Sequence, residues 1–528
     1  MQPLIPLTIN SPGTKGLNSQ QSATNIDIGW ATQLDNCVYD LAGRITARKG
    51  WTKLTTSGSP GVFDIEAIHC YETSSTTSVV SASNLKIFSG TTALTDRTGT
   101  ITAPTANKWK LVTYNSQFIL GFQAAHAPIA ATGIAAFTNL SAVAGYTAPS
   151  TGDLNGGVAL SAFGRAWATD TDGQTLHYSG SALNYMKWAD ADGGGKIQTQ
   201  AYWPNGSDFI TGLAAWEDKL IVFGKNATLV YASPQIPASI ALFDTIKGVG
   251  CSARDSVCEV GTDVFFLSET GVRSLKRTFL TTKAPIQDIS NNVRDLFLIY
   301  AAGQAPKVRS VYNQKEGLYI LLFPQTSTTD IFCFDIKKLQ QDQAANSSQN
   351  VRVSQWNGFG RCACLAYGRD EIMYGGFRDN VNSPNGVIGS YSGYLDNTLT
   401  YTGTYKSPWI DLSNDQQAGT FIKIPKEAKI TTAGGSSYAL TAYWAYDFST
   451  SLHTLNKSVM SGGSTMEWGL FEWGIAEWGG STKALSNTKF PLSGTGQFIQ
   501  FGISWVINGY EITIQKIDLF IKKGRLSR

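Results

Sequence analysis

Charged residues are scarce in this sequence. Asp, Glu, Lys and Arg make up 15 % of its 528 residues, whereas roughly a quarter is usual for soluble proteins. Helical proteins of this size carry far more Glu, Lys and Arg, so the shortage argues against a largely helical fold. The 42 basic and 39 acidic residues nearly cancel to a net charge of +3. This balance does not indicate a tight nucleic-acid binder.

Cysteine and histidine are also rare. The seven cysteines are scattered and odd in number, so they form neither a disulfide framework nor a zinc motif. This cysteine usage fits assembly in a reducing compartment. The four histidines are His69, His126, His177 and His453, and none has a partner at metal-ligand spacing. The sequence therefore predicts no metal site and no cofactor.

The signature motifs of common enzymes are missing. The chain has no GxSxG nucleophile elbow, no GxxxxGK[ST] phosphate loop and no HExxH helix. Residues 193–196 are rich in glycine but lack the P-loop frame, so they predict a turn. Residues 169–175 superficially resemble the Asp-box turn of sialidases, but Gly173 directly follows Asp172 and the aromatic residue is absent. An Asp-Gly hairpin turn is the better interpretation.

No catalytic residues are predicted, and we expect that the chain is not an enzyme. A Ser-His-Asp set stays open at this stage, because such triads assemble from residues far apart in a sequence.

Long hydrophobic runs are missing as well. The N-terminus lacks a basic segment and a long apolar stretch, so no secretory signal is predicted. Residues 111–152 contain no Asp, Glu, Lys or Arg, but they include polar side chains, prolines and many small residues. They are too weakly apolar to span a bilayer. We interpret them as a strand hairpin followed by a long pliable loop, and we expect no stable membrane insertion.

What the sequence has instead is glycine, serine and threonine, with Val, Ile and aromatic residues spread throughout. This composition is typical of β-proteins. One pattern recurs: a short apolar strand, a polar turn of two or three residues, and an alternating apolar strand. Seven units of this kind lie near residues 65–88, 112–121, 163–168, 216–224, 260–272, 311–335 and 367–375. Each predicts a β-hairpin, and the spacing of roughly 45–55 residues is close to that of a four-stranded propeller blade.

The strand pattern changes after Tyr394. Longer alternating strands without the hairpin pattern follow, as in residues 497–523, and they predict a β-sandwich. The length also favours two or three domains. We therefore predict an all-β fold with a β-propeller of six or seven blades over residues 60–395 and a C-terminal β-sandwich over 396–528. Residues 1–59 form an N-terminal arm and a strand that braces the propeller. Helix content is expected to be small, with one short helix over 290–297.

The most unusual segment repeats Glu-Trp-Gly with a period of five residues between positions 467 and 480. On a strand, Trp468 and Trp478 would share one face and Trp473 the other. Three interpretations stay open: indoles that cover the sandwich core, an inter-subunit contact, or stacking on a sugar. The C-terminus is locally basic and is either a solvated tail or a docking segment for an acidic neighbour. The candidate interface residues are thus Trp468, Trp473, Trp478, Lys522, Lys523 and Arg525.

One N-terminal motif is more specific. In residues 35–51 a strand with an asparagine leads to a glycine, a turn, and then an Arg-x-Gly-aromatic pattern. The motif positions are Asn36, Gly43, Arg48, Gly50 and Trp51. This stretch resembles the opening of tail nozzle proteins of short-tailed bacteriophages, also called tail tubular protein B or packaged-DNA-stabilisation proteins. Lys49 stands where that family more often has proline. Residues 177–188, 265–272 and 517–525 are similar to the family as well.

The resemblance implies a structural protein of the virion tail that is assembled in the host cytoplasm. Six copies would form a ring at the distal end of a short tail, below a portal or adaptor ring and next to tail fibres or a tip protein. The ring would retain packaged double-stranded DNA and conduct it through its lumen without sequence-specific binding.

Two other functions stay open. The first is a tail-associated glycan-binding protein or depolymerase built on the propeller. The second is a kelch-like interaction module, although neither a kelch double-glycine signature nor a Trp-Asp pair of WD repeats supports it.

Overall fold

The computed structural model describes residues 4–22, 26–101, 108–280, 288–301, 307–325, 327–337, 351–357, 360–379, 385–411, 421–460 and 485–526. Strands account for 52 % of the structure and helices for 7 %, which confirms the all-β prediction. The α-helices among these residues are α1 (Leu275–Leu280) and α2 (Arg294–Ala301). Short 3-10 turns are η1 (Leu140–Ala142), η2 (Asp190–Asp192), η3 (Gln200–Tyr202), η4 (Pro237–Ser239), η5 (Arg254–Ser256) and η6 (Asn291–Val293). Within the described ranges, no helix is long and apolar enough to cross a membrane.

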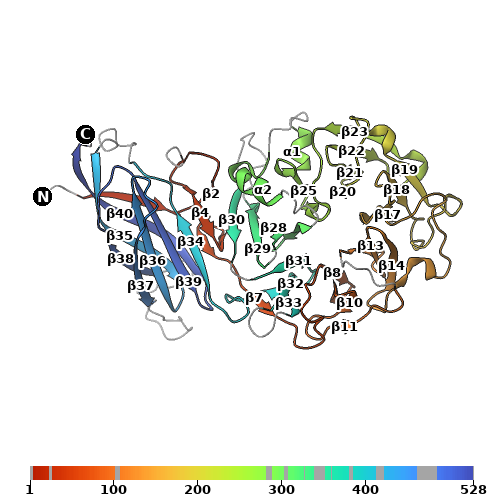
Figure 1. The fold of residues 1–528 in the computed structure, drawn as a ribbon, viewed down its shortest axis with the longest axis horizontal. Coiled ribbons are helices and arrows are strands. Elements are labelled where there is room, and N and C mark those ends of the chain that lie inside the picture. Colours follow the sequence, from red (N-terminus) through yellow and green to blue (C-terminus); the bar gives the residue numbers. More distant parts are fainter. Residues whose placement is uncertain are drawn as a thin grey trace, which may run out of the picture.

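Seven blades form a ring, the β-propeller, in the described part of the chain (Figure 1): six are separate small sheets, and blade 6 is one end of a sheet of nine strands. Blade 1 consists of β8 (Ala67–Glu72), β9 (Thr77–Ser83), β10 (Lys86–Ser89) and β11 (Thr95–Asp96). Blade 2 consists of β12 (Lys110–Tyr114), β13 (Phe118–Gln123), β14 (His126–Thr132) and β15 (Thr138–Asn139). Blade 3 consists of β16 (Ala159–Ala162), β17 (Arg165–Thr169), β18 (Thr175–Tyr178) and β19 (Gly195–Gln198). Blade 4 consists of β20 (Gly212–Trp216), β21 (Lys219–Phe223), β22 (Ala227–Ala232) and β23 (Ala241–Lys247). Blade 5 consists of β24 (Cys258–Val260), β25 (Asp263–Ser268) and β26 (Gly271–Ser274).

Blades 6 and 7 complete the ring. Blade 6 consists of β27 (Arg309–Asn313), β28 (Leu318–Pro324), β29 (Thr329–Asp335) and β30 (Arg352–Trp356). Blade 7 consists of β31 (Cys362–Tyr367), β32 (Met373–Arg378), β33 (Gly386–Tyr391) and β7 (Trp51–Lys53). The innermost strand β31 of blade 7 lies beside β8 of blade 1, so the circle is closed. Blade 7 takes its outer strand, β7, from the N-terminal segment, where Trp51 pairs with Tyr391.

The hairpins form because their turns and strands are encoded locally. In blade 2, Asn115 and Ser116 both have positive φ, as a two-residue hairpin turn with the twist of the flanking strands requires. All seven residues of β28 are buried, because each blade stacks on two neighbours and covers both faces of its middle strands. Full burial of one large apolar side chain contributes about 1.5–3 kcal/mol.

The structure of blade 2 differs from the prediction for residues 111–152. The stretch 111–152 is not a hairpin with a long pliable loop, because β14 and β15 follow the predicted hairpin and extend it to a four-stranded sheet. Ile129, Ala130 and Ala131 of β14 are buried. Small side chains pack closely between blades, so a weakly apolar sequence still forms a buried strand there.

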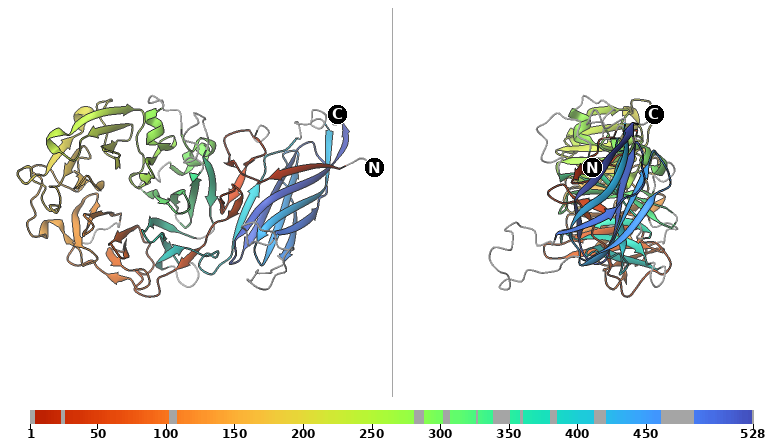
Figure 2. Two further views of the ribbon diagram at one scale, coloured as in Figure 1. Left: turned by 180° about the vertical axis from the view of Figure 1, so that it is seen from behind. Right: turned by 90° about the vertical axis from the view of Figure 1, so that its left-hand side faces the viewer.

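The sandwich lies beside the ring and consists of two sheets (Figure 2). The first sheet has β38 (Leu485–Pro491), β35 (Phe421–Gly434), β40 (Ile512–Leu526), β1 (Ile5–Asn10), β6 (Ile45–Ala47) and β5 (Cys37–Tyr39). The second has β4 (Gln33–Asp35), β34 (Tyr401–Lys406), β39 (Ile499–Ile507), β36 (Ser437–Tyr446) and β37 (His453–Met460), while β2 (Gly16–Leu17) and β3 (Trp30–Ala31) form a separate parallel pair.

The N-terminal segment therefore does more than brace the propeller. Its strands join both sheets of the sandwich, and β4 also bridges β30 of blade 6 through Asp35 and Gln355. One continuous sheet of nine strands thus runs from the propeller into the sandwich.

Candidate functional site

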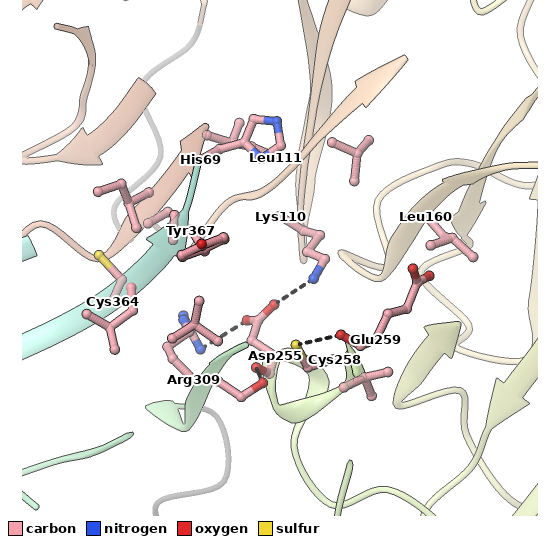
Figure 3. A pocket seen from close by; sticks show the side chains of 18 of the residues that line it. His69, Lys110, Leu111, Leu160, Asp255, Cys258, Glu259, Arg309, Cys364 and Tyr367 are labelled. Carbon is pink, nitrogen blue, oxygen red and sulfur yellow. Dashed lines mark hydrogen bonds and ion pairs between the residues drawn. The ribbon is translucent and has the colours of Figure 1, made fainter. Parts of the chain in front are cut away.

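The axis of the propeller holds a cavity of about 530 Å³ (Figure 3). The innermost strand of every blade contributes to its wall: β8, β12, β16, β20, β24, β27 and β31. The volume lies within the range of roughly 300–1,000 Å³ that is usual for ligand pockets. This cavity is the candidate functional site of the described residues.

A cluster of charges lies at one end of the cavity, around Asp255 of the turn η5. Its carboxylate is 3.2 Å from Lys110 Nζ, 2.6 Å from Arg254 Nη2 and 3.0 Å from Arg309 Nη1. Burial by itself would raise the pKa of Asp255, but the charges of Arg254, Arg309 and Lys110 hold it well below its ordinary value. Asp255 is therefore ionised at neutral pH.

Arg254 extends this cluster across the ring. Its guanidinium donates to the carbonyl of Gly157 at 2.8 Å, just before blade 3, and to that of Lys108 at 3.0 Å, just before blade 2. Ser310 of blade 6 donates to the Asp255 carbonyl at 3.1 Å. The dipeptide Arg254-Asp255 thus connects blades on opposite sides of the ring and lies across its axis.

The other end of the cavity adjoins a second hollow, of about 470 Å³, at the hairpin turns of blades 1, 6 and 7. Gln314 and Tyr367 line both spaces. In this outer hollow Lys315 Nζ lies 2.6 Å from Glu371. The axial cavity is therefore reached from the turn face of the propeller.

Two titratable side chains in the cavity wall, His69 and Cys258, are held in their uncharged forms. Burial, aided by the charge of Lys110, lowers the pKa of His69 to about 4, and its Nε2 lies 2.7 Å from Thr113 Oγ1. Burial, aided by Glu259, raises the pKa of Cys258 to about 12. Both groups are thus uncharged at neutral pH, so Cys258 is not a thiolate nucleophile there.

The structure keeps the four histidines apart. His69, His126 and His177 lie in blades 1, 2 and 3, and His453 lies in the sandwich. His177 Nε2 is 3.2 Å from Asp170 Oδ2, but the His177 side chain is only 2 % exposed, so a substrate cannot reach this pair. Among the described residues, no group of three or more His, Cys, Asp or Glu side chains could hold a metal ion.

The segment that resembles an Asp box is a hairpin turn, as predicted. The Asp172 carboxylate accepts hydrogen bonds from the backbone N–H of Gln174 at 2.7 Å and of Thr175 at 2.8 Å, and Gly173 has φ +66°. These contacts close the turn between β17 and β18.

The N-terminal motif forms a buried joint between propeller and sandwich, and we call it the Arg48 joint. The Arg48 side chain has 0 % exposure, and its guanidinium donates to both carboxylate oxygens of Asp396, at 2.9 and 2.6 Å. It also donates to Asn36 Oδ1 at 3.0 Å and lies 4.1 Å above the Tyr401 ring. A buried guanidinium needs such a complete set of partners.

The other motif residues shape the backbone around the Arg48 joint. A Cβ atom at Gly50 would lie 2.0 Å from the carbonyl oxygen of Leu395, so only glycine fits. Trp51 packs against Phe377 and Tyr391, with ring centroids 4.6 and 5.2 Å away. Gly43 has φ +79° in the turn between β5 and β6. The motif is thus structural, and its partners Asp396 and Tyr401 carried no signal in the sequence.

The basic C-terminal run differs from one of its two interpretations, the solvated tail, while docking on an acidic neighbour stays a prediction. Lys522, Lys523 and Arg525 lie within β40, so this part of the run is a sandwich strand and not a solvated tail. The Lys523 ammonium lies 3.9 Å above the ring of Phe421, in a cation–π contact. The other candidate interface residues, Trp468, Trp473 and Trp478, lie outside the described residues.

Comparisons with known proteins identify no family. No family model matches the chain, and no curated protein matches it. Similar solved structures include PorZ, a surface component of the type-IX secretion system of Porphyromonas gingivalis, with 12 % identity and a TM-score of 0.33 over 67 % of this chain and 44 % of PorZ. Others are the AfRom2 CNH domain (11 %, TM-score 0.26, 65 % of this chain and 98 % of that one) and AztD from Citrobacter koseri (10 %, TM-score 0.24, 62 % and 97 %). Such low scores carry no argument about function.

Proposed function

We propose that this chain is a structural subunit of a short bacteriophage tail, the nozzle ring at its distal end, which retains packaged DNA and conducts it during ejection. One observation carries the proposal: four of the five positions of the N-terminal motif that resembles the nozzle family lie at or next to a single buried joint. Arg48, Asn36, Gly50 and Trp51 all serve to fix the propeller against the sandwich.

This joint supports a mechanical role. Two connections link the two domains: the Arg48–Asp396 ion pair, and the sheet that continues from β30 through β4 to β34. A ring of identical subunits closes only when neighbours keep a fixed rotation. A subunit without a free hinge between its domains satisfies that requirement.

The axial cavity supports a DNA path that lies outside the propeller. Arg254 and Asp255 cross the axis, and a space of about 530 Å³ is far too small for a duplex. In this proposal six copies enclose the lumen between them, below a portal or adaptor ring and next to tail fibres or a tip protein. The protein needs no catalytic activity for this task, and the uncharged His69 and Cys258 of the cavity are in keeping with that.

Cryo-electron microscopy of virions that carry this protein tests the proposal. We expect six copies around the distal tail axis, with the propellers arranged around a channel wide enough for duplex DNA. A monomeric spike on the axis, or a lumen lined by unpaired Lys and Arg, would contradict it, because unpaired cations would bind phosphates and retard ejection.

A degradation assay on the purified protein separates the alternative function. We expect capsule, lipopolysaccharide and peptidoglycan to stay intact. Reproducible cleavage that is lost on changing one Asp or Glu to its amide would identify a depolymerase instead.

A further inference from the structure

We propose that the outer hollow, at the hairpin turns of blades 1, 6 and 7, binds a neutral saccharide. Its volume of about 470 Å³ lies within the usual range of roughly 300–1,000 Å³ for ligand pockets. The site does not depend on the tail role and uses no residue of the Arg48 joint. Its basis is the chemistry of its walls, which combine one aromatic ring with polar side chains of both charges.

The walls of the outer hollow are strongly polar. Seven residues line it, and all but one glycine carry a hydrogen-bonding side chain. These six are Glu72, Gln314, Lys315, Tyr367, Arg369 and Glu371. They include carboxylates that accept, cations that donate, and an amide and a hydroxyl that do both. A ligand rich in hydroxyl groups matches such walls, because each hydroxyl also donates and accepts.

The formal charges of the lining residues sum to zero. Two cations, Lys315 and Arg369, stand with two carboxylates, Glu72 and Glu371. Lys315 and Glu371 form an ion pair in which the side chains are 56 % and 60 % exposed. An anion or a cation would leave the hollow with a net charge, whereas a neutral ligand keeps the balance. The ligand is therefore uncharged.

Hydrogen-bonding capacity is left over on two blades. Glu72 Oε1 accepts the backbone N–H of Arg369 at 2.6 Å, but the Arg369 guanidinium makes no ion pair in the described part of the chain. The amide of Gln314 is exposed and has no hydrogen-bond partner among the described residues either. A guanidinium presents five donors, and an amide presents both donors and an acceptor. Neighbouring hydroxyls of a sugar ring can satisfy these groups.

Tyr367 supplies the apolar contact that a sugar ring also needs. It lines both the outer hollow and the axial cavity (Figure 3). Its hydroxyl accepts the backbone N–H of Lys315 at 3.3 Å, which fixes the ring in place. The C–H groups on one face of a sugar pack against an aromatic face, while the hydroxyls at the sugar's edge reach the polar groups around it.

The site is assembled before a ligand arrives. The contact of Glu72 with Arg369 joins blade 1 to blade 7, and two contacts of Lys315, with Tyr367 and with Glu371, join blade 6 to blade 7. The walls therefore come from three turns that already hold one another. Such preorganisation lowers the entropy that binding would cost.

Isothermal titration of the full-length chain with lactose, cellobiose and N,N′-diacetylchitobiose tests the proposal, with glycine and inorganic phosphate as comparison probes. We expect saturable binding of at least one of the three disaccharides. Its affinity should change by less than about twofold between low and high salt, because a neutral ligand makes no ion pair that salt could screen.

Substitutions locate the binding site. Arg369→Met should weaken binding by about tenfold and Gln314→Ala by about threefold, as expected for the loss of a charge-assisted and of a neutral hydrogen bond. Tyr367→Leu should abolish binding, whereas Tyr367→Phe should retain it, because packing against the sugar needs only the ring. The matched control is Gln235→Ala, which changes an exposed glutamine that follows β22 of blade 4 and should bind like the wild type.

Three results would overturn the proposal. The first is the absence of saturable binding of all three disaccharides. The second is binding of glycine or phosphate in their place, which would identify a site for a zwitterion or an anion. The third is wild-type affinity in both Arg369→Met and Gln314→Ala, whose positions are exposed so that both variants should fold. None of these results bears on the nozzle ring, which is tested on virions.

Discussion

At the residue scale, the surroundings of a side chain decide what it can do. His69 lies on the innermost strand of blade 1 and faces the axial cavity. Its imidazole is held neutral there by burial and by Lys110. The sequence shows only an isolated histidine, whose ordinary pKa would place its titration near physiological pH.

We predict that His69 makes the protein sensitive to mild acid. Its pKa falls from 6.5 to about 4 on folding, so between these values the unfolded chain binds the proton and the folded chain does not. The free energy of unfolding is thus unaffected above pH 6.5 and falls as the pH drops towards 4, by up to about 3 kcal/mol. Urea unfolding between pH 7.5 and 4 measures this.

The variant His69→Gln should show a shallower pH dependence in that window, because glutamine does not titrate. The variant should gain stability relative to the wild type as the pH falls towards 4, because only the wild type must release a proton on folding there. Parallel curves for the two proteins would show that His69 is not responsible.

At the scale of elements, strand β7 closes the propeller. It is three residues long, and its partner β33 lies more than 300 residues later in the chain. The chain loses conformational entropy when residues far apart in sequence pair. Packing of side chains must therefore hold β7 against β33. The close approach of Gly50 to Leu395 and the contacts of Trp51 with Phe377 and Tyr391 provide this packing.

We predict that Gly50→Ala displaces β7. The added methyl group would lie 2.0 Å from the Leu395 carbonyl oxygen, so the backbone must shift and the pairing with β33 weakens. Hydrogen exchange of the amides of Gly389, Ser390 and Tyr391 should accelerate, while the strands of blade 3 keep their protection. Thr52→Ala, a change at an exposed position of the same strand, is the control and should have little effect. Unchanged exchange at β33 in Gly50→Ala would contradict this account.

At the scale of the whole molecule, the Arg48 joint connects propeller and sandwich through a buried ion pair. We predict that Asp396→Asn lowers the free energy of unfolding by about 3–5 kcal/mol, because it leaves the fully buried Arg48 without its counter-charge. Urea unfolding measures the loss. Small-angle scattering should show a single rigid shape for the wild type and a broader range of shapes for the variant.

Two controls accompany this change. Asp27→Asn breaks an ion pair with Lys15 whose side chains are 58 % and 46 % exposed, and it should cost less than about 1 kcal/mol. Replacing both Arg48 and Asp396 by apolar residues should restore part of the stability, because no buried charge is then unpaired. A loss in Asp396→Asn no larger than that in Asp27→Asn would refute the structural role of the joint.

The sequence by itself determined the local architecture. Turn residues and alternating strands specify each hairpin, since both partners lie within a few residues of one another, and the seven predicted units correspond to the seven blades. The Asp-Gly turn at Asp172 and the short helix near residue 290 were predictable for the same reason. The resemblance at the N-terminus singled out Arg48 without showing what it binds.

Only the tertiary structure decided which distant segments meet. Arg48 and Asp396 are 348 positions apart, and Asp255 draws its cations from three separate parts of the chain. The same holds for β35 and β40, whose pairing places Lys522 and Lys523 of the basic C-terminal run in a sheet. The edge of a strand can form hydrogen bonds with any extended segment. Which distant strands pair therefore depends on which edges remain free and on which side chains pack together. A local sequence pattern does not contain this information.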